Sequence, residues 1–591
     1  MSADELRCPR RPLTIGGRRL MRRIILLGVI LMALAAGLML DLRARGLAWR
    51  FFWSQTGEEE PLAQIRGMIE WAGNLIRAQP RNDPLVPVQH TGENPFGMNT
   101  FLQLEPDPTK IEQQLAQISA AGFAWIRQEF TWEDIEIHGR GDFEDRRNVD
   151  AIGVVDAWAK YDRIVDLAEQ YGLQIQARIS NPPQWAQPSP DAGDMAPPAL
   201  IEDYVNFART LAERYRGRIR YYQVWNEPNI YPEWGEADVD PEAYTELLCA
   251  AHDALKAVDP EIVVISGALA PTVELSGRNL NDFVFFERMY AAGAGACFDV
   301  LSMQGYGLNS GPTDRRMRPV TVNVGRSQYI RELMVAHGDA HKPIWLSEAA
   351  WNAVPDEEAD PRPIDARYNF GQVTLEQQAR YMPLFYERIQ AEWPWVGVVN
   401  YWFFTLPDDR RSDESFYYFR MAEPDYSDEK PSYTTLPVYD AMREYITGGD
   451  HPLRIGVHQA NDHWLIEADG DVVEASGAQF GRALAGGRTV FTAEGTQVML
   501  RWQGDALTVT VNGAATAYTG GGAAWVETLI ASAPFGGRFD VAVEGGAALL
   551  DTVIVRDDRA IAVGAAAAGV IGMACVAGIA VFIRRRRRAL R

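Results

Sequence analysis

The stretch Arg-Tyr-Tyr-Gln-Val-Trp-Asn-Glu-Pro-Asn, residues 220–229, decides the fold. Residues 220–225 form an aromatic and β-branched run that is typical of a buried strand, and Asn-Glu-Pro at its end is typical of a turn. Similar runs recur along the chain, each separated from the next by a helical pattern. A glutamate directly after a buried strand lies where a parallel barrel places residues for chemistry.

Eight such runs lie between about residues 94 and 447. The expected strands are Phe96–Phe101, Trp125–Phe130, Leu173–Ile179, Arg220–Trp225, Ile262–Ser266, Val300–Gln304, Ile344–Ser347 and Val396–Phe403. The expected helices are Thr109–Ala121, Ala157–Tyr171, Ile201–Tyr215, Pro241–Val258, Asn281–Ala292, Gly325–His337, Leu375–Ala391 and Leu436–Tyr445. Strands spaced by single helices indicate a parallel sheet. Eight units favour an α/β fold with a closed (β/α)8 TIM barrel at 94–447 over an open sheet, and no glycine-rich phosphate loop follows a strand.

A second glutamate follows an apolar run in Pro-Ile-Trp-Leu-Ser-Glu-Ala-Ala-Trp, residues 343–351. Glu227 and Glu348 thus end the fourth and seventh expected strands, which meet at one rim of a barrel. Retaining glycosidases hold two carboxyl groups about 5–5.5 Å apart, one as acid and one as nucleophile. The pair therefore predicts cleavage of a glycosidic bond with retention of configuration.

The sequence resembles glycoside hydrolase clan A, the retaining (β/α)8 glycosidases, and most closely families 39 and 5. The resemblance covers the barrel and rests mainly on Trp-Asn-Glu-Pro-Asn. It implies that Glu227 is the acid/base and Glu348 the nucleophile. The implied substrate-binding residues are Asn226 for the sugar 2-hydroxyl, Arg127 and Tyr306 beside the nucleophile, Trp402 as a platform under the reacting sugar, and Trp185 for a neighbouring subsite.

One segment departs from the family pattern. Family 39 often has His-x-Tyr after the sixth strand, whereas this chain has Gln304-Gly305-Tyr306. The tyrosine contact to the nucleophile is kept, but the glutamine puts the local hydrogen-bond network and the exact family in doubt. Each residue also has a purely structural interpretation, because a strand-end glutamate is often a solvated rim charge and Arg127, Tyr306, Trp402 and Trp185 can serve packing alone.

Three functions share these residues. The favoured one is a retaining β-glycosidase that acts on a neutral or weakly charged polysaccharide of the envelope or of exported material. A transglycosylase uses the same residues and resolves the intermediate with a sugar hydroxyl instead of water. A non-catalytic glycan-binding scaffold is the alternative from another class, since a fold alone does not grant activity.

The two ends of the chain differ from its body. Apolar, uncharged runs occupy 24–40 and 561–583, and arginine clusters lie in the tails 1–23 and 584–591. Each run is long enough to span or nearly span a bilayer, and arginines favour the cytoplasmic side. We therefore expect two transmembrane helices in the cell membrane, with everything between them extracytoplasmic. Ala33-Leu34-Ala35 also resembles a signal-peptide cleavage site, so a cleaved first segment stays open.

Two further segments flank the barrel. Residues 41–93 are expected to form a juxtamembrane region with an aromatic belt at Trp49–Trp53, an amphipathic helix at 61–78 and then a linker. Residues 452–556 alternate in short runs with an Asn512-Gly513 turn, which predicts an antiparallel β-sandwich. A packing role for this sandwich is favoured, and sugar binding is the alternative.

The composition of the chain argues against some classes of partner and cofactor. The chain has 591 residues, four cysteines, eight histidines and a formal net charge of −22. Such an acidic exterior does not suit nucleic acid, whose binding relies on lysine and arginine. No histidine spacing is typical of a metal site, and glycoside hydrolysis needs no cofactor, so neither is expected. Cys249 and Cys297 are the only plausible disulfide pair, but buried free thiols are the favoured interpretation.

Overall fold

The computed structural model describes residues 15–425 and 432–559 of the chain. The expected second membrane segment at 561–583, the arginine tail at 584–591 and most of the first tail lie outside these residues. The chain divides into two compact units. One contains Met1–Ala78 and Thr313–Met317, and the other contains Gln79–Pro312 and Arg318–Arg591.

The larger unit contains a parallel barrel, as the sequence predicts. Its strands are β1 (Phe96–Thr100), β2 (Trp125–Thr131), β5 (Gln174–Ser180), β6 (Tyr221–Val224), β7 (Val263–Ile265), β8 (Leu301–Gln304), β9 (Ile344–Ala349) and β10 (Val396–Tyr401). They form one parallel sheet in the order β7-β6-β5-β2-β1-β10-β9-β8. Parallel bridges Ile265–Val300 and Leu269–Met303 join the two ends of that order, so the sheet closes.

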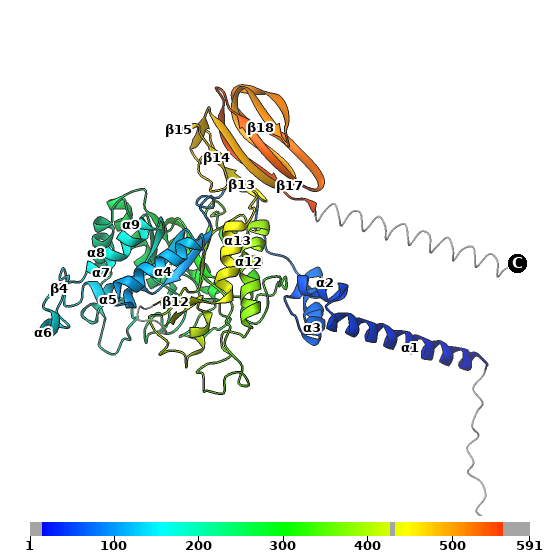
Figure 1. Cartoon of the computed structure of the whole chain (residues 1–591), viewed down its shortest axis with the longest axis horizontal. Coiled ribbons are helices and arrows are strands. Elements are labelled where there is room, and N and C mark those ends of the chain that lie inside the picture. Colours follow the sequence, from blue (N-terminus) through cyan, green and yellow to red (C-terminus); the bar gives the residue numbers. More distant parts are fainter. Residues whose placement is uncertain (1–14, 426–431, 560–591) are drawn as a thin grey trace, which may run out of the picture. The chain divides into compact units, whose positions relative to one another are not determined.

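Helices follow the strands and surround them (Figure 1). They are α4 (Pro108–Ala120), α7 (Ala159–Gln170), α8 (Ile201–Arg214), α9 (Pro241–Val258), α10 (Asp282–Ala291), α11 (Ser327–Ala336), α12 (Leu375–Glu392) and α13 (Pro437–Gly448). Several begin as local chemistry dictates: Asp107, Asp240 and Asn281 accept bonds from first-turn N–H groups, and Thr374 forms a capping box with Gln377.

Short elements fill the connections between these strands and helices. They are η2 (Leu102–Leu104), α5 (Trp132–Ile135), β3 (Glu144–Asp145), α6 (Val149–Ile152), β4 (Val155–Asp156), η3 (Gln184–Ala186), η4 (Ala294–Ala296), η5 (Val324–Arg326), η6 (Ser415–Phe419), β11 (Ala422–Asp425) and β12 (Ser432–Thr435). None of them is expected from the sequence, because elements of two to five residues carry too few positions for a periodic pattern.

The barrel interior is apolar at the start of the strands and polar toward their ends. Trp125, Tyr221 and Trp345 stack within 5.3 Å of one another at the beginning of β2, β6 and β9. Farther along, Gln176 donates to Gln223 at 3.0 Å, and Asn400 donates to Gln176 at 3.0 Å. These buried amides bond to one another, and the carboxyl ends of the strands carry the residues of the site.

A disulfide joins Cys249 of α9 to Cys297, which follows η4. The favoured interpretation of two free thiols is therefore wrong. Four cysteines in a long chain give little reason to pair any two of them, whereas the fold brings these two Cα atoms to 4.7 Å. That separation lies within the range that a disulfide requires.

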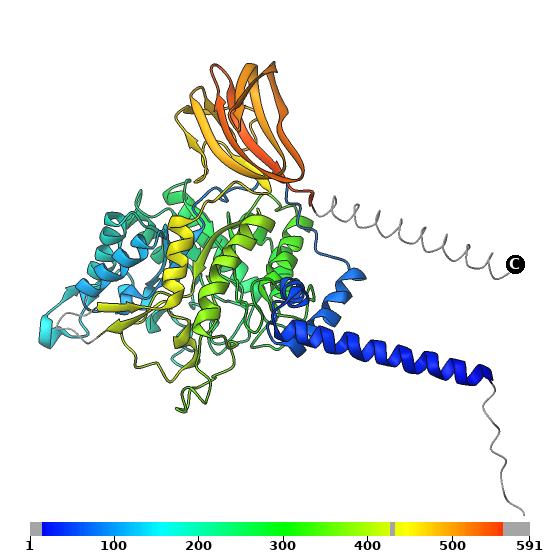
Figure 2. The same ribbon diagram turned by 45° about the vertical axis from the view of Figure 1, so that its right-hand side comes forward.

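The C-terminal region is antiparallel, as predicted. Its strands are β13 (Gly456–Gln459), β14 (Glu467–Ala468), β15 (Asp471–Glu474), β16 (Arg482–Ala485), β17 (Arg488–Val511), β18 (Ala514–Glu544) and β19 (Leu549–Arg556). They form one sheet, and Thr508 of β17 pairs with both Ala517 and Glu544 of β18, so the sheet bends back on itself (Figure 2). The antiparallel domain is therefore confirmed, and its strands enclose one apolar core.

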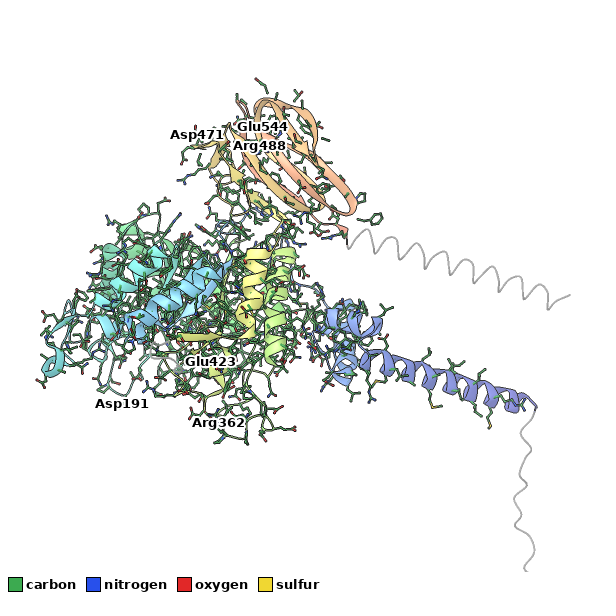
Figure 3. All side chains as sticks on the ribbon, viewed as in Figure 1. Asp191, Arg362, Glu423, Asp471, Arg488 and Glu544 are labelled. Atoms are coloured by element: carbon green, nitrogen blue, oxygen red, sulfur yellow. A yellow bond between two sulfur atoms is a disulfide. The ribbon has the colours of Figure 1, made fainter. Side chains whose placement is uncertain are left out.

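The residues of this sheet explain its hairpin turn, one ion pair between its strands and its apolar core. Asn512 and Gly513 have φ of 48° and 82° and connect β17 to β18, as a tight hairpin requires. Arg488 and Glu544, labelled in Figure 3, face each other across the two strands with a 3.3 Å ion pair. The side chains of Val498, Leu500 and Trp502 are fully buried in the core of the sheet.

The smaller unit begins with α1 (Ile15–Arg43), followed by α2 (Leu47–Thr56), α3 (Pro61–Ala72) and η1 (Gly73–Leu75). Within α1, Ile24–Arg43 has a mean hydropathy of 2.5, and its side chains project outward (Figure 3). It is the one helix in the described residues that is long and apolar enough to cross a membrane, and a signal sequence near the N-terminus has the same properties. Trp49–Trp53, expected as an aromatic belt, lies inside α2.

Five residues from the connection after β8 belong to this smaller unit. Arg316 pairs with Asp314 at 2.8 Å and with Glu58 at 2.9 Å. Asn74 donates to the carbonyl oxygen of Arg315 at 2.6 Å, and Arg77 donates to that of Met317 at 2.7 Å. Thr313–Met317 is thus packed as part of the α2–α3 hairpin, although it is distant in sequence.

Candidate active site

Glu227 lies just past the end of β6, in a backbone turn with unusual dihedral angles. Trp225 and Glu227 have φ of 73° and 40°, a region that residues other than glycine seldom adopt. The Trp225 N–H donates to the carbonyl oxygen of Ile179 at 3.0 Å, and the Glu227 N–H donates to that of Ala268 at 2.9 Å. Neighbouring strands therefore hold this turn, and such strain is concentrated at functional sites.

Glu348 lies within β9, with 4% of its surface exposed. The Arg127 Nη1 donates to its Oε1 at 2.9 Å, and the Tyr306 hydroxyl donates to its Oε2 at 2.6 Å. Each carboxylate oxygen thus has one donor, and one donor is cationic. Burial and the charge of Glu348 raise the pKa of Tyr306, so its hydroxyl keeps the proton that it donates.

Arg127 of β2 connects Glu348 to the neighbouring strands. Its Nη2 donates to Asn226 Oδ1 at 2.7 Å, its Nη1 to Asn99 Oδ1 at 2.8 Å, and its Nε to Gln223 Oε1 at 2.8 Å. Because the oxygen of Asn226 accepts from Arg127, the amide nitrogen of Asn226 is left to donate elsewhere. A buried guanidinium that bonds four side chains therefore orients both the expected nucleophile and the residue expected to bind the sugar 2-hydroxyl.

Glu227 is half-buried, and Gln304 Nε2 donates to its Oε1 at 2.9 Å. Burial raises the pKa of Glu227 well above its usual range, and the charges of Glu348 and Glu233 add to this effect. The two glutamates thus have opposite surroundings. Glu348 has an arginine and a tyrosine as donors, whereas Glu227 has only a neutral amide and nearby negative charge. This difference suits one ionised carboxylate and one protonated acid.

The raised pKa of Glu227 predicts a mildly acidic, bell-shaped pH profile. The acid must hold its proton in the first step, so activity should persist above the pH at which an ordinary glutamate ionises and fall as pH rises through the pKa of Glu227. The same step needs an ionised nucleophile, so the rate should also fall at low pH. Measuring kcat/KM from pH 4 to 9 tests this, and a flat profile would contradict it.

Trp402 follows β10 and borders the same cavity as Arg127. The cavity is lined by Asn99, Thr100, Phe101, Arg127, Glu129, Arg178 and Trp402. The Trp402 ring is half-buried, and its edge meets Phe101 at a centroid distance of 5.5 Å. This position agrees with a platform for a sugar ring, because indole faces pack well on apolar faces of pyranoses.

Trp185 lies apart from this group. Its indole N–H donates to the carbonyl oxygen of Glu136 at 2.8 Å, and its ring meets Trp132 edge-on at 5.7 Å. The Arg140 guanidinium lies 5.7 Å from the same ring. Among the described residues, these contacts place Trp185 in the connections after β2 and β5 and do not join it to Glu348. Its subsite role stays a prediction.

Sequence reasoning misses Asn99 and Gln223, and it notes Gln304 at a strand end without assigning it a contact. Asn99 and Gln223 bond to Arg127, and Gln304 bonds to Glu227. All three are polar residues inside or at the end of apolar strands, and each is at most 2% exposed. A polar residue at an inward position is a usable signal, but its partner depends on which strands become neighbours. In the described residues, no group of histidine, cysteine, aspartate and glutamate is placed to hold a metal.

The chain matches no protein-family model and no curated protein. Solved structures do match. A family 39 glycoside hydrolase from Bacteroides cellulosilyticus WH2 is 16% identical with a TM-score of 0.44, covering 78% of this chain and 83% of that one. A monomeric β-xylosidase from Caulobacter crescentus CB15 is 15% identical with a TM-score of 0.42, covering 78% and 97%. A GH5_18 protein from Streptomyces cattleya is 16% identical with a TM-score of 0.40, covering 61% and 83%.

Proposed function

We propose that this protein is a retaining β-glycosidase that hydrolyses a polysaccharide by double displacement. The observation that carries the proposal is the asymmetric carboxyl pair. Glu348 is bonded to Arg127 and Tyr306, while the pKa of Glu227 is raised by burial and by the charge of Glu348. A nucleophile and an acid at the carboxyl ends of strands in one barrel are what this reaction requires.

In the proposed first step, Glu348 Oε attacks the anomeric carbon while Glu227 transfers its proton to the leaving oxygen. The bond from the anomeric carbon to the leaving oxygen breaks, and a covalent glycosyl-enzyme forms. Neutralising Glu348 in this way removes one cause of the raised pKa of Glu227, so Glu227 becomes a better base. It then takes a proton from water, whose oxygen displaces Glu348 and restores both groups.

The Asn226 amide supports the transition state in this mechanism. Arg127 fixes its oxygen, so its amide nitrogen is left as the donor. A bond to the sugar 2-hydroxyl strengthens as positive charge develops on the ring. The proposed substrate-binding residues are therefore Asn226, Arg127, Tyr306 and Trp402, with Trp185 as a more distant candidate.

The deciding experiment uses the full-length protein in detergent with a panel of β-linked polysaccharides and aryl β-glycosides. Proton NMR during the first turnovers should show a β-configured product before mutarotation. An α-configured first product would refute the double displacement. Products longer than their parent oligosaccharide would favour transglycosylation, and no product from any glycan would favour the scaffold.

We further propose that the catalytic unit faces the extracytoplasmic side of the cell membrane. Three observations support this location: the apolar helix ending at Arg43, the arginines that precede Ile24, and the Cys249–Cys297 disulfide. Disulfides persist mainly in oxidising compartments, and arginines resist translocation. An enzyme held there would act on envelope or exported glycans close to its own membrane.

Protease accessibility tests this topology. In intact cells or spheroplasts, added protease should digest an epitope inserted near Gly520 and should spare one placed after Arg591. Lysed cells provide the control, because both epitopes should then be digested. Protection of the first epitope in intact cells would contradict the outward orientation, whichever fate the N-terminal segment has.

A further inference from the structure

A second charged group lies in the catalytic cavity and takes no part in the proposed chemistry. Arg178 of β5 pairs with Glu129 of β2 at 2.6 Å, with side chains 13% and 11% exposed. Both residues line the cavity that Arg127 and Trp402 also line. Ser180 donates to the other oxygen of Glu129 at 2.6 Å, so the carboxylate is fixed on both sides. The ion pair therefore lies beside Arg127, which holds the expected nucleophile.

Glu233 brings a third carboxyl group to this ion pair. It belongs to the loop directly after Glu227, and its carbonyl oxygen accepts from the Trp225 indole at 2.7 Å. Trp234 is buried and packs against the same indole at 5.6 Å. The side chain of Glu233 hydrogen-bonds Asn226 and lies within electrostatic reach of Arg178. The loop is therefore anchored with Glu233 turned toward the catalytic residues.

The hydrogen-bond donors and acceptors of these groups are complementary to those of a sugar hydroxyl. Among the described residues, the buried Nε of Arg178 has no hydrogen-bond partner, and the side chain as a whole is 13% exposed. The carboxyl group of Glu233 supplies acceptors nearby. A sugar hydroxyl donates once and accepts once, and it can satisfy both. A buried N–H that lacks a partner costs stability until a ligand supplies one, which is typical of a binding position.

The charges argue against an anionic sugar. Burial alone would lower the pKa of Arg178, but Glu129 and Glu233 raise it, and Glu348 acts in the same direction. Three carboxylates thus already surround this one guanidinium. Burial raises the pKa of Glu233 to about 7, since Arg178 offsets only part of the cost. A further carboxylate from a uronic acid would meet repulsion rather than a free cation.

We propose that Glu129, Arg178 and Glu233 form a glycone subsite that binds the hydroxyl groups of an uncharged sugar and excludes uronic acids, with Glu233 as its specificity-determining residue. This inference rests on the proposed glycosidase function and names its substrate class. Glu129 holds Arg178 in place, the guanidinium of Arg178 donates, and Glu233 accepts.

The test compares full-length wild type with Glu233→Gln on three matched aryl β-glycosides: a neutral hexoside, its 6-carboxylate and its 2-amino analogue. Glu236→Gln is the control, because Glu236 lies on the same loop but pairs with the exposed Arg278 at 2.8 Å. For the neutral glycoside, Glu233→Gln should raise KM by about 10-fold, the loss expected for one hydrogen bond. The rate ratio of uronide to neutral glycoside should rise, and Glu236→Gln should behave as wild type.

Several results would overturn the subsite. They are an unchanged KM in Glu233→Gln, the same change in Glu236→Gln, or a wild-type preference for the uronide or the amino glycoside. If Glu233→Gln does not fold, Glu233→Asp replaces it, and that variant should raise KM yet still exclude the uronide.

If the protein is not a glycosidase, binding measurements can still test the subsite separately. If wild type releases no aryl group, calorimetric binding of the same glycosides to Glu348→Gln and to its double variant with Glu233→Gln tests the subsite alone. Weaker binding of the neutral glycoside by the double variant would support the subsite without catalysis, and equal binding, or none by either variant, would overturn it.

Discussion

Replacing Glu348 by glutamine is expected to abolish turnover, with a loss in kcat on the order of 10⁴-fold or more. The amide cannot form the covalent glycosyl-enzyme, although it keeps the shape of the side chain and can still accept from Tyr306. Every substrate should lose activity to a similar extent, because Glu348 must attack the anomeric carbon of each one before the second step can occur. Initial rates on an aryl β-glycoside and on a polysaccharide measure the effect.

Two controls separate chemistry from folding in this variant. Glu348→Gln leaves Arg127 without its ionic partner, and breaking a buried pair costs about 3–5 kcal/mol. Thermal unfolding followed by circular dichroism shows whether the protein remains folded at the assay temperature. Glu242→Gln, an exposed carboxylate that pairs with Arg288 on the outer helices, should leave the rate unchanged. A folded Glu348→Gln protein with near wild-type activity would end the nucleophile assignment.

Replacing Glu227 by alanine is expected to give a loss that depends on the leaving group. A general acid contributes roughly 10²–10⁴-fold when the departing oxygen needs a proton. A 2,4-dinitrophenyl glycoside leaves without one, so its glycosylation step should stay close to the wild-type rate. The second step lacks its base, and the glycosyl-enzyme should accumulate as an initial burst of phenol.

Measurement of this second variant uses two substrates and one added nucleophile. Burst kinetics on the dinitrophenyl glycoside and steady-state rates on a natural glycan give the two halves of the comparison. Azide, a small anion that needs no base, should enter the space left by the side chain, speed the second step and yield a β-glycosyl azide. Equal losses on both substrates, or an α-configured azide, would rule out Glu227 as acid/base.

The barrel was predictable because its signal is repeated eight times. Each expected strand overlaps its observed counterpart to within a few residues, since a buried parallel strand is a short continuous apolar run. The hairpin at Asn512-Gly513 was predictable for a different reason, because its backbone needs positive φ at two successive positions. Helix α2 was not, as its aromatic residues also fit an interfacial belt.

The candidate site was predictable in its chemistry but not in its connections. Strand order alone places Arg127, Glu227 and Glu348 at one rim of a barrel. The bonds from Arg127 to Asn99 and Gln223 depend on side-chain directions that only the closed sheet determines. Glu233 could not be predicted from the strand pattern, because it lies in a loop. A hydrogen bond from the Trp225 indole to the Glu233 carbonyl oxygen holds that loop in place. The Cys249–Cys297 pairing likewise depends on where α9 meets the connection after α10.

The segment Thr313–Met317 gives the chain an unusual connectivity. The polypeptide leaves the catalytic unit after Pro312, packs into the α2–α3 hairpin and returns at Arg318, in addition to the junction at Ala78. One proteolytic cut in the linker that begins at Gln79 would therefore leave the two fragments joined through Thr313–Met317. Separating them requires a second event that pulls the buried Asp314 and Arg316 away from Glu58.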